Sequence, residues 1–546
     1  MHRIAALPGG WEPGLEGVIF VEQNPAPIIF LTAKDTDIQT LSIARQDFPQ
    51  NFSELRAVNL LQLQQQLTID TYTDQVLAKA KIIVLRLLGG RAYWSYGLEV
   101  VRDLANRLGI HLLVLPGDDR PDLDLMSHST VSLGICDRTW HYLNEGGVDN
   151  IKNAFLNLSD LFLGTHYQPP SPQPIAPWGI YQPIGLKNDR PIQGQVGIIF
   201  YRAYYQAANL GVIDTLCQAL ADRGLGTTAV YVSSLQNPDI QSGIHSHFAN
   251  QFIDLLLVST GFSIAKPTQI LGADSQPTLW QRLNVPVLQI VFSSGTYEQW
   301  QGNQQGLAPR DMAMQIALPE VDGRITTRAI ACKSVRIHDP ALETETIALE
   351  PIPDRLEFVA DLAANWVRLR RTSTGDRAIA IVLANYPNRD GRLANGVGLD
   401  TPQSCVEFLL ALANAGYDLG DRAMLPKTGD ELIDRLTRSI TNDPEGWTLR
   451  TVHQSLSIHD YQSWFLTLPE GVQAAIQQRW GLIADSHSHD PDLVPRIDIN
   501  GQPAIPIAGL QFGKIFVGIQ PSRGYDRDPS LNYHAPDLEP THDYLA

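Results

Sequence analysis

The chain has few cysteines and no long apolar run. Its four cysteines are far apart among 546 residues and form no Cys-x-x-Cys pair: Cys136, Cys217, Cys332 and Cys405. This spacing predicts neither a disulfide framework nor a thiolate zinc site, and it favours a reducing environment. No segment approaches the roughly 18 consecutive apolar residues of a membrane-spanning helix, and an early Pro-Gly-Gly interrupts any export signal. We therefore expect a cytoplasmic protein with no membrane span.

Positive charge is also scarce. The chain carries 41 Lys and Arg against 58 Asp and Glu, which gives a formal net charge of −17 and an isoelectric point near 5.2. An excess of negative charge over most of the protein surface repels nucleic acids and anionic membranes. We expect no nucleic-acid partner.

Several common catalytic motifs are missing. The segment GVGLDT from Gly396 lacks the third glycine of the dinucleotide fingerprint. The segment GLQFGKI from Gly509 is one residue too short for a P-loop and has no Ser or Thr after its lysine. Neither His-Glu-x-x-His nor Gly-x-Ser-x-Gly occurs. The sequence thus predicts no ATP site, and it offers no sequence signature of a zinc protease or a serine hydrolase.

Two His-x-His pairs are candidate metal ligands. One is His245 with His247, and the other is His487 with His489 inside the acidic segment DSHSHDPD. Imidazole and carboxylate groups at this density can bind a divalent transition metal. A solvated loop between helices explains the second pair equally simply, and we predict no metal site of the protein's own.

Short apolar, β-branched runs recur along the chain, each followed by a polar or glycine-containing loop and a segment with helical spacing. They begin at Ile28, Lys81, His111, Val196, Thr227, Asp254, Val285, Ala378 and Lys514. Strands that are apolar throughout are usually covered on both faces. We therefore predict an α/β protein made of several doubly wound, mainly parallel-sheet units of the Rossmann or flavodoxin type.

The domain boundaries are predicted near residues 125, 190 and 375. The segment from His166 to Pro191 holds seven prolines, so we expect it to lie outside every sheet. The predicted parts are an amino-terminal α/β domain (1–125), a helical segment with the Pro-rich connector (126–190), a second α/β domain (191–375) and a further domain (376–546).

Polar loops follow several predicted strands, where ligands of α/β proteins usually bind. The segment NYPNRDGRLANG after the Ala378 run offers Asn388, Arg389 and Asn395. A polar connection closed by Asx-turns is the alternative. The other loops offer further candidates: Arg91 and Trp94, Tyr201 and Arg202, and Arg523. Aromatic rings beside an arginine suit a planar conjugated ligand, although the Tyr and Trp cluster can equally pack an interface.

Taken together and in order, six segments resemble the CobN/magnesium chelatase family of chelatase large subunits. They are GGRAYWSYG, LPGDDRPD, FYRAYY, GLAPRDMAMQIALPEVDGR, IVLANYPNRDGRLANGVGLDTP and VGIQPSRGY. The resemblance runs through essentially the whole chain. GGRAYWSYG and PNRDGRLANG are more similar to the aerobic cobaltochelatase branch, CobN, than to the magnesium branch.

The resemblance implies an ATP-dependent insertion of Co2+, the substrate metal, into the corrin precursor hydrogenobyrinic acid a,c-diamide during cobalamin biosynthesis. ATP would be hydrolysed by separate AAA+ partner subunits, which agrees with the missing P-loop. The alternatives are a magnesium chelatase H-type subunit that binds protoporphyrin IX, and a non-catalytic tetrapyrrole-binding module.

A corrin precursor carries carboxylates and amides around a planar ring, so its binder needs arginine forks, amides and aromatic faces. We predict substrate contacts at Tyr201, Arg202, Asn388, Arg389, Asn395 and Arg523, with Arg91 and Trp94 as further candidates. The family's His-Gly-Lys-His-Gly-type segment follows a region that here reads THDYLA. The resemblance therefore implies that the catalytic residues lie beyond Ala546. It also implies that 376–546 begins a chelatase body domain, and that this amino-terminal half is inactive without a carboxyl-terminal half.

Overall fold

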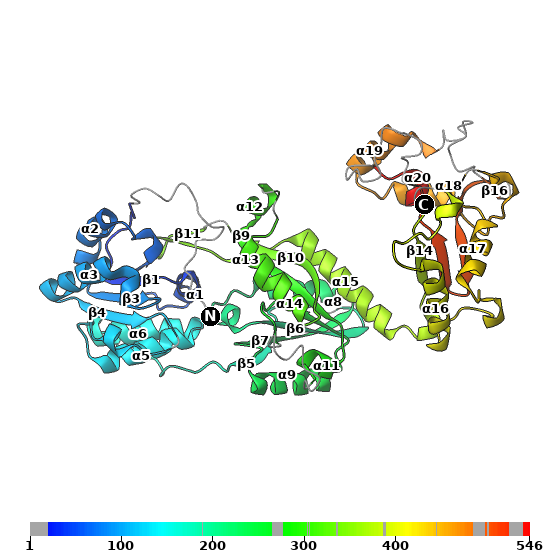
Figure 1. Cartoon of the computed structure of the whole chain (residues 1–546). Helices are drawn as coiled ribbons and strands as arrows, with labels where there is room; N and C mark the ends of the chain where they lie inside the picture. Colours follow the sequence, from blue (N-terminus) through cyan, green and yellow to red (C-terminus); the bar gives the residue numbers. More distant parts are fainter. Residues whose placement is uncertain are drawn as a thin grey trace. The chain divides into compact units, whose positions relative to one another are not determined.

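The computed structural model describes residues 20–118, 120–187, 189–264, 277–302, 304, 306–334, 337–385, 389–443, 445–483, 497–499, 502–522 and 539–546. The chain forms two compact units, Met1–Arg368 and Leu369–Ala546 (Figure 1). No described helix combines the length and the apolarity that a membrane crossing requires.

The first unit begins with a four-stranded parallel sheet of order β2-β1-β3-β4. Its strands are β1 (Ile28–Thr32), β2 (Leu55–Asn59), β3 (Ile82–Leu87) and β4 (His111–Pro116). The helical elements of this lobe are α1 (Asp35–Arg45), η2 (Leu60–Gln62), α2 (Gln66–Gln75), η3 (Leu77–Lys79), η4 (Arg91–Trp94), α3 (Ser95–Leu108), α4 (Leu123–Met126), α5 (Leu133–Glu145) and α6 (Val148–Leu163). One hydrophobic core joins the sheet to α2 and α3, and another joins its opposite face to α1, α5 and α6. Every residue of β1 and β3 is buried, as predicted for continuous apolar strands.

A second sheet of the same unit has the order β13-β10-β9-β8-β6-β7-β5. Its strands are β5 (Trp178–Tyr181), β6 (Gly194–Tyr201), β7 (Leu225–Val232), β8 (Leu255–Val258), β9 (Val287–Thr296), β10 (Ile325–Lys333) and β13 (Leu349–Pro351). The five central strands are parallel, and the edge strands β5 and β13 are antiparallel to their neighbours.

Helices cover both faces of this second sheet. α8 (Gly211–Ala221) and α15 (Pro353–Arg371) pack on one face, and α9 (Pro238–Gln251) and α11 (Leu279–Leu283) pack on the other. The remaining helical elements are α7 (Arg202–Gln206), α12 (Tyr297–Gly302), α13 (Pro309–Asp311), η5 (Met312–Ala317) and α14 (Leu318–Val321). The predicted α/β class with mainly parallel sheets is confirmed.

The Pro-rich connector contributes a strand, contrary to the prediction that it lies outside every sheet. β5 lies between Pro177 and Pro183 and pairs antiparallel with β7 at the sheet's edge. An edge strand tolerates neighbouring prolines because only one side of its backbone must pair. Gly179 also allows β5 to approach the side chain of Tyr231 on β7 closely, since a Cβ at Gly179 would lie 2.5 Å from the Tyr231 hydroxyl. The predicted domain boundaries near 125, 190 and 375 stay predictions.

A hairpin between β10 and β13 fastens the second sheet to the first. We call residues 337–346, comprising β11 (Ile337–Asp339) and β12 (Thr344–Thr346), the hairpin clasp. Its turn residue Leu342 is fully buried in the core of the first sheet, and its carbonyl accepts a hydrogen bond from Ala57 N (3.3 Å). The carboxylate of Glu343 lies 3.1 Å from the guanidinium of Arg56.

The second unit contains a three-stranded sheet of order β14-β19-β18, with β14 (Ile379–Leu383) parallel to β19 (Ile515–Ile519) and β18 (Gly509–Phe512) antiparallel to it. α16 (Thr401–Asn414) and α17 (Gly429–Thr437) share its hydrophobic core. Short turns are η6 (Thr374–Asp376), η7 (Asp390–Arg392), η8 (Arg422–Met424) and η9 (Trp447–Leu449).

A smaller antiparallel sheet in the second unit has the order β15-β17-β16, from β15 (Gln454–Ser457), β17 (Gln502–Ile507) and β16 (Ile497–Ile499). Beside it lie α18 (Ile458–Phe465), α19 (Glu470–Trp480) and α20 (His542–Leu545). His542 is buried there and lies within hydrogen-bond distance of the Tyr461 hydroxyl (2.8 Å) and the Gly481 carbonyl (2.9 Å).

Candidate functional site

The carboxyl ends of the parallel strands of the second sheet carry a network of polar side chains. Tyr201 ends β6, and its hydroxyl donates a hydrogen bond to the carbonyl of Gly261, which follows β8 (3.3 Å). Burial raises the pKa of Tyr201, so the phenol stays a neutral donor. A Cβ at Gly261 would lie 2.7 Å from the carbonyl oxygen of Met314, so glycine permits this close approach.

Arg324 fixes the loop after β8. Its guanidinium is buried and donates to the carbonyls of Thr260 (2.7 Å) and Phe262 (2.8 Å). It also binds the side chains of Gln289 (3.0 Å) and Asp322 (3.0 Å). Burial lowers the pKa of Arg324, and the neighbouring Asp322 carboxylate opposes that effect. Sequence reasoning did not single out this residue, although it lies in the conspicuous segment that ends PEVDGR.

Asp311 fixes the end of β9 in the same way. Its carboxylate accepts hydrogen bonds from the amide (2.8 Å) and hydroxyl (3.0 Å) of Ser294 and from the side-chain amide of Gln315 (3.2 Å). The residues after Asp311 form a π-helical turn, η5, a feature that often marks functional sites in proteins. Asp311 and Arg324 thus hold rigid the edge at which Tyr201 lies.

Lys333 brings a positive charge to this edge. It ends β10 and is partly buried, and no described residue accepts a hydrogen bond from its ammonium. The pKa of Lys333 is lowered, because burial outweighs the opposing effect of the carboxylates of Asp35, at the start of α1, and Asp311. The side chain is therefore available to an anionic group of a ligand.

Arg202, a predicted substrate contact, is engaged inside the protein. One terminal nitrogen donates to the carbonyl of Ile175 (2.6 Å) and lies 3.2 Å from the carboxylate of Glu145. Its buried Nε has no partner among the described residues. These contacts join α7 to the end of α5.

The loop after β3 places its two predicted residues differently. Trp94 is only 4% exposed, and its indole nitrogen donates to the carbonyl of Leu63 (2.6 Å). A Cβ at Gly97 would lie 2.2 Å from the ring, so glycine makes room for it. Burial and packing thus account for the position of the Trp94 ring. Arg91 is exposed and pairs with Glu99 on the surface (3.1 Å).

In the second unit, the loop after β14 exposes two predicted residues. The side chain of Arg389 is 66% exposed, and its Nη1 lies 3.3 Å from Asp443 Oδ1. Asn395 is exposed, and its backbone amide donates to the carbonyl of Arg392 (3.2 Å). Asn388 and Arg523 lie outside the described residues.

A charged cluster behind Arg389 stabilises this loop. Asp390 pairs with Arg450 (2.6 Å) and accepts from the hydroxyl of Thr441 (2.8 Å). The backbone amide of Asp390 donates to Asp443 (3.2 Å). Burial raises the pKa of Asp443, but amide donors and the charges of Arg389 and Arg450 outweigh it and lower the pKa overall. The cluster presents Arg389 to solvent on a fixed backbone.

Asn385 is the most unusual polar residue of this loop. It follows β14, is 1% exposed, and neither its amide nitrogen nor its oxygen has a hydrogen-bond partner in the described part of the chain. Buried amides are normally satisfied, and an unsatisfied one costs roughly 1–3 kcal/mol.

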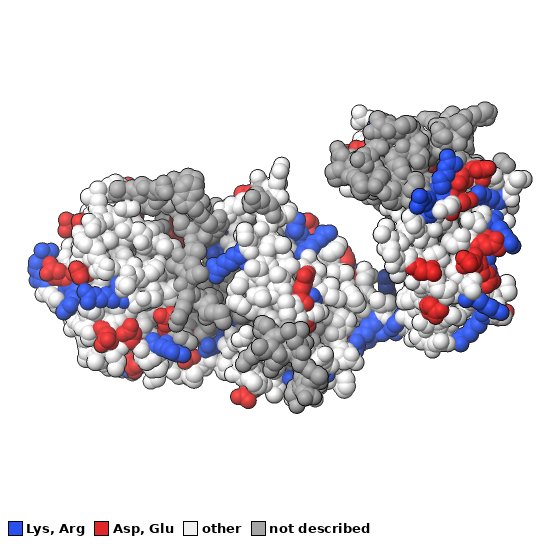
Figure 2. Space-filling model, viewed as in Figure 1, with Lys and Arg blue, Asp and Glu red and all other residues white. Residues whose placement is uncertain are grey.

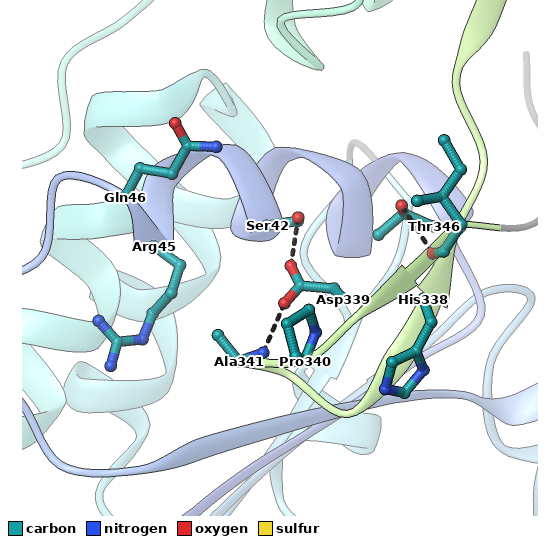
Figure 3. Close-up of a pocket in the computed structure, with 9 residues that line it drawn as sticks. Ser42, Arg45, Gln46, His338, Asp339, Pro340, Ala341 and Thr346 are labelled. Atoms are coloured by element: carbon teal, nitrogen blue, oxygen red, sulfur yellow. Dashed lines mark hydrogen bonds between the residues drawn. The ribbon is translucent and has the colours of Figure 1, made fainter.

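A shallow cavity of about 500 Å³ lies at the hairpin clasp. Figure 3 shows Ser42 of α1 pointing to Asp339 of β11, to which it donates a hydrogen bond. Asp339 also accepts from the backbone amide of Ala341 (2.8 Å). The guanidinium of Arg45 lies over the ring of Phe48, 5.4 Å from its centroid. These contacts explain the cavity as the seam between α1 and the clasp.

Among the described residues, no group of three or more His, Cys, Asp or Glu side chains is placed to hold a metal ion. His245 and His247 lie on α9, where burial lowers the pKa of His247. The pair His487 and His489 lies outside the described residues.

On the face drawn in Figure 2, charges of both signs are interspersed and uncharged residues predominate.

Each unit thus carries polar side chains after the strands of its parallel sheet, which is where ligands of α/β proteins usually bind. The chain belongs to the CobN/Magnesium Chelatase family, whose model matches residues 140–546. The resemblance found in the sequence motifs is thereby confirmed.

Individual relatives place the chain within that family. It is 39% identical over 562 residues to the aerobic cobaltochelatase subunit CobN of Sinorhizobium sp., a match that covers 100% of this chain and 42% of the relative. Identity to the CobN subunit of Pseudomonas aeruginosa is 36%, covering 100% and 43%. The magnesium-chelatase H subunit of Rhodobacter capsulatus is 27% identical, covering 64% and 28%.

A solved structure agrees with these matches. The catalytic subunit of cobaltochelatase from Mycobacterium tuberculosis superposes with a TM-score of 0.71 at 29% identity, over 95% of this chain and 40% of that one. The chain therefore spans less than half the length of the relatives it matches.

Proposed function

We propose that this chain is the tetrapyrrole-binding part of an ATP-dependent cobaltochelatase large subunit, which inserts Co2+ into hydrogenobyrinic acid a,c-diamide in cobalamin biosynthesis. The observation that carries the proposal is the match to CobN subunits along 100% of the chain at 36–39% identity. The match to a magnesium-chelatase H subunit covers 64% of the chain at 27% identity. Sequence similarity therefore favours the cobalt branch over the magnesium branch.

The substrate's carboxylates and amides are bound by side chains at strand ends. Arg389 offers a guanidinium fork that is mostly free of the protein, and Asn395 offers an exposed amide. Tyr201 and Lys333 offer a phenol and an ammonium at the edge of the second sheet. We retain Arg91, Trp94, Arg202, Asn388 and Arg523 as proposed contacts, of which Trp94 is the weakest because its ring is buried.

Metal insertion also needs groups that remove two pyrrolic protons and that hold Co2+ as it loses water. We assign these groups to the portion of the relatives that this chain does not span, in line with the 42% coverage of the Sinorhizobium subunit. ATP hydrolysis is assigned to AAA+ partner subunits. On this proposal the chain alone binds the corrin but does not insert cobalt. The complex works in the cytoplasm, where the four buried cysteines of this chain stay reduced.

An absorbance titration tests the proposal. Hydrogenobyrinic acid a,c-diamide and protoporphyrin IX are each titrated against the purified chain, and we expect tighter binding of the corrin. Tighter binding of the porphyrin would favour the magnesium branch instead, and binding of neither would contradict the proposal. Adding the remaining part of the subunit, the AAA+ subunits, Co2+ and ATP then distinguishes a chelatase from a passive tetrapyrrole-binding module, because only the chelatase forms the cobalt corrin.

A further inference from the structure

One face of the parallel strand pair in the second unit is not covered by the described chain. α16 and α17 share a core with Leu383, Ile515 and Val517, which point to one side of the sheet. On the other side of β14, Ala380 and Val382 are exposed, and 59% of Val382 is accessible. Parallel strands are normally covered on both faces, so an exposed apolar side is unusual.

The neighbouring strands make most of this uncovered face apolar, and the exposed Gln511 of β18, which lies beside Phe516, is its polar margin. In the parallel register, Ala380 lies beside Phe516 and Val382 lies beside Gly518. The ring of Phe516 lies against one glycine of β19 and one of β18. A Cβ at Gly518 (β19) would lie 2.4 Å from the ring, and a Cβ at Gly509 (β18) would lie 2.5 Å from it. A flat surface of this kind suits the packing of another layer.

The outer edge of β14 is open among the described residues as far as Val382, and just beyond it the carbonyl of Ala384 accepts from Ala394 N (2.7 Å). Ile379 N donates to the carbonyl of Lys514, and the carbonyl of Leu383 accepts from Gln520 N, so alternate residues of β14 face β19. The backbone groups of Ala380 and Val382 therefore face away from β19. No other described strand pairs with β14. Natural edge strands usually carry a charge or a proline that blocks further pairing, and β14 (IAIVL) has neither.

The length of the relatives indicates what covers this surface. The matched chain accounts for 42% and 43% of two CobN subunits and for 40% of the solved cobaltochelatase subunit. More than half of each relative is therefore available to complete the sheet. We infer that the portion of the large subunit that this chain does not span adds a strand along β14 and lays a helix over Ala380, Val382 and Phe516.

Site-specific labelling tests this inference. The four native cysteines are buried, so a cysteine introduced at an exposed site is the main target of a maleimide reagent. Val382→Cys reports on the proposed surface, and Leu449→Cys, at a residue that is 90% exposed in the same unit, is the matched control. Each variant is labelled alone and together with the polypeptide from the same organism that corresponds to the unmatched part of the Sinorhizobium subunit.

We expect Val382→Cys to react readily in the chain alone and about tenfold or more slowly with the remaining polypeptide, because covered surface reacts only through local opening. The Leu449→Cys rate should not change. Equal labelling of Val382→Cys in both samples would overturn the inference. Slow labelling of Val382→Cys in the chain alone would also overturn the inference. If that slow rate depended on protein concentration, a second copy of the chain would be covering the surface; if it did not, the chain would be covering the surface itself. No substrate is involved, so the result is independent of the proposed activity.

Discussion

The guanidinium of Arg389 lies 3.3 Å from the carboxylate of Asp443, although two thirds of the arginine side chain (66%) is exposed. Asp443 belongs to the cluster that also contains Asp390 and Arg450. The pair thus positions a cation at the surface while leaving most of its hydrogen-bonding capacity free, which is the arrangement that a carboxylate ligand requires.

Replacing this arginine should weaken corrin binding with little effect on folding. Arg389→Ala removes a charge-assisted fork worth roughly 1.5–3 kcal/mol, or about ten- to a hundredfold in affinity for hydrogenobyrinic acid a,c-diamide. The free energy of unfolding should change by less than about 0.5 kcal/mol because the side chain is exposed. Arg438→Ala, an exposed arginine that follows α17 in the same unit, is the control and should bind normally. Undiminished binding by Arg389→Ala would show that the loop is only a structural turn.

Replacing Asn385 should also weaken binding without loss of stability, although this side chain is buried. Asn385→Leu replaces a buried amide that has no described partner, so the unfolding free energy should rise by roughly 1 kcal/mol or stay unchanged. Corrin affinity should fall if the amide is kept for the ligand. A urea titration and an absorbance titration of the same variant measure the two effects. A large loss of stability would contradict this interpretation, because it would mean that the amide is satisfied within the fold.

The buried guanidinium of Arg324 is expected to be essential for the edge of the second sheet. Arg324→Met leaves the buried Asp322 carboxylate without its cation and frees two loop carbonyls, at a cost of about 3–5 kcal/mol. Hydrogen exchange of residues 255–262 should quicken. Arg328→Met, at an exposed position on β10, which Arg324 directly precedes, is the control. Its guanidinium only stacks on the surface ring of Phe358 (3.4 Å), so stability should change little. Equal stability of the two variants would contradict the assigned role.

The local pattern of the sequence was enough to predict most of the strands that are buried in parallel sheets. It missed β2 and β10, whose apolar residues are interrupted by arginine and threonine. The runs at Val196 and Lys81 became β6 and β3, because an apolar run bounded by loops needs no long-range information to be recognised. β5 was missed because its four residues lie between prolines and pair only at an edge. The hairpin clasp was missed because the contact of Leu342 with Ala57 joins residues far apart in the chain.

The candidate site was predicted less completely, for a physical reason. Sequence motifs identify which residues occupy a loop, but burial decides which of them reach solvent. Trp94 and Arg389 both stand in polar loops after a strand, yet one fills a core and the other is exposed. Arg324 and Asp311 were not singled out because their role lies in contacts with backbone groups of distant segments.

The hairpin clasp should loosen at low pH through Glu343. Its carboxylate accepts from the amide of Asn24 and from that residue's side chain (2.9 Å), and it pairs with Arg56 (3.1 Å). Burial raises the pKa of Glu343, but these donors and the arginine charge outweigh it and lower the pKa overall. A lowered folded-state pKa means that the carboxylate stabilises the fold above the unfolded pKa of about 4.3, and that this contribution is lost as pH falls through the folded value.

Glu343→Gln isolates that contribution. At pH 7 the variant should lose about 1.5–3 kcal/mol of unfolding free energy, the usual worth of hydrogen bonds to a charged group, and exchange of residues 337–346 should quicken. The difference from wild type should shrink below about pH 4, where the wild-type carboxylate is also protonated. Glu54→Gln is the matched control, because Glu54 contacts the same Arg56 at 3.4 Å but is 68% exposed, so its loss should cost at most about 1 kcal/mol. The difference in unfolding free energy between Glu343→Gln and wild type could instead persist unchanged well below about pH 4. That result would assign the clasp's stability to Leu342 and the backbone contacts and not to this carboxylate.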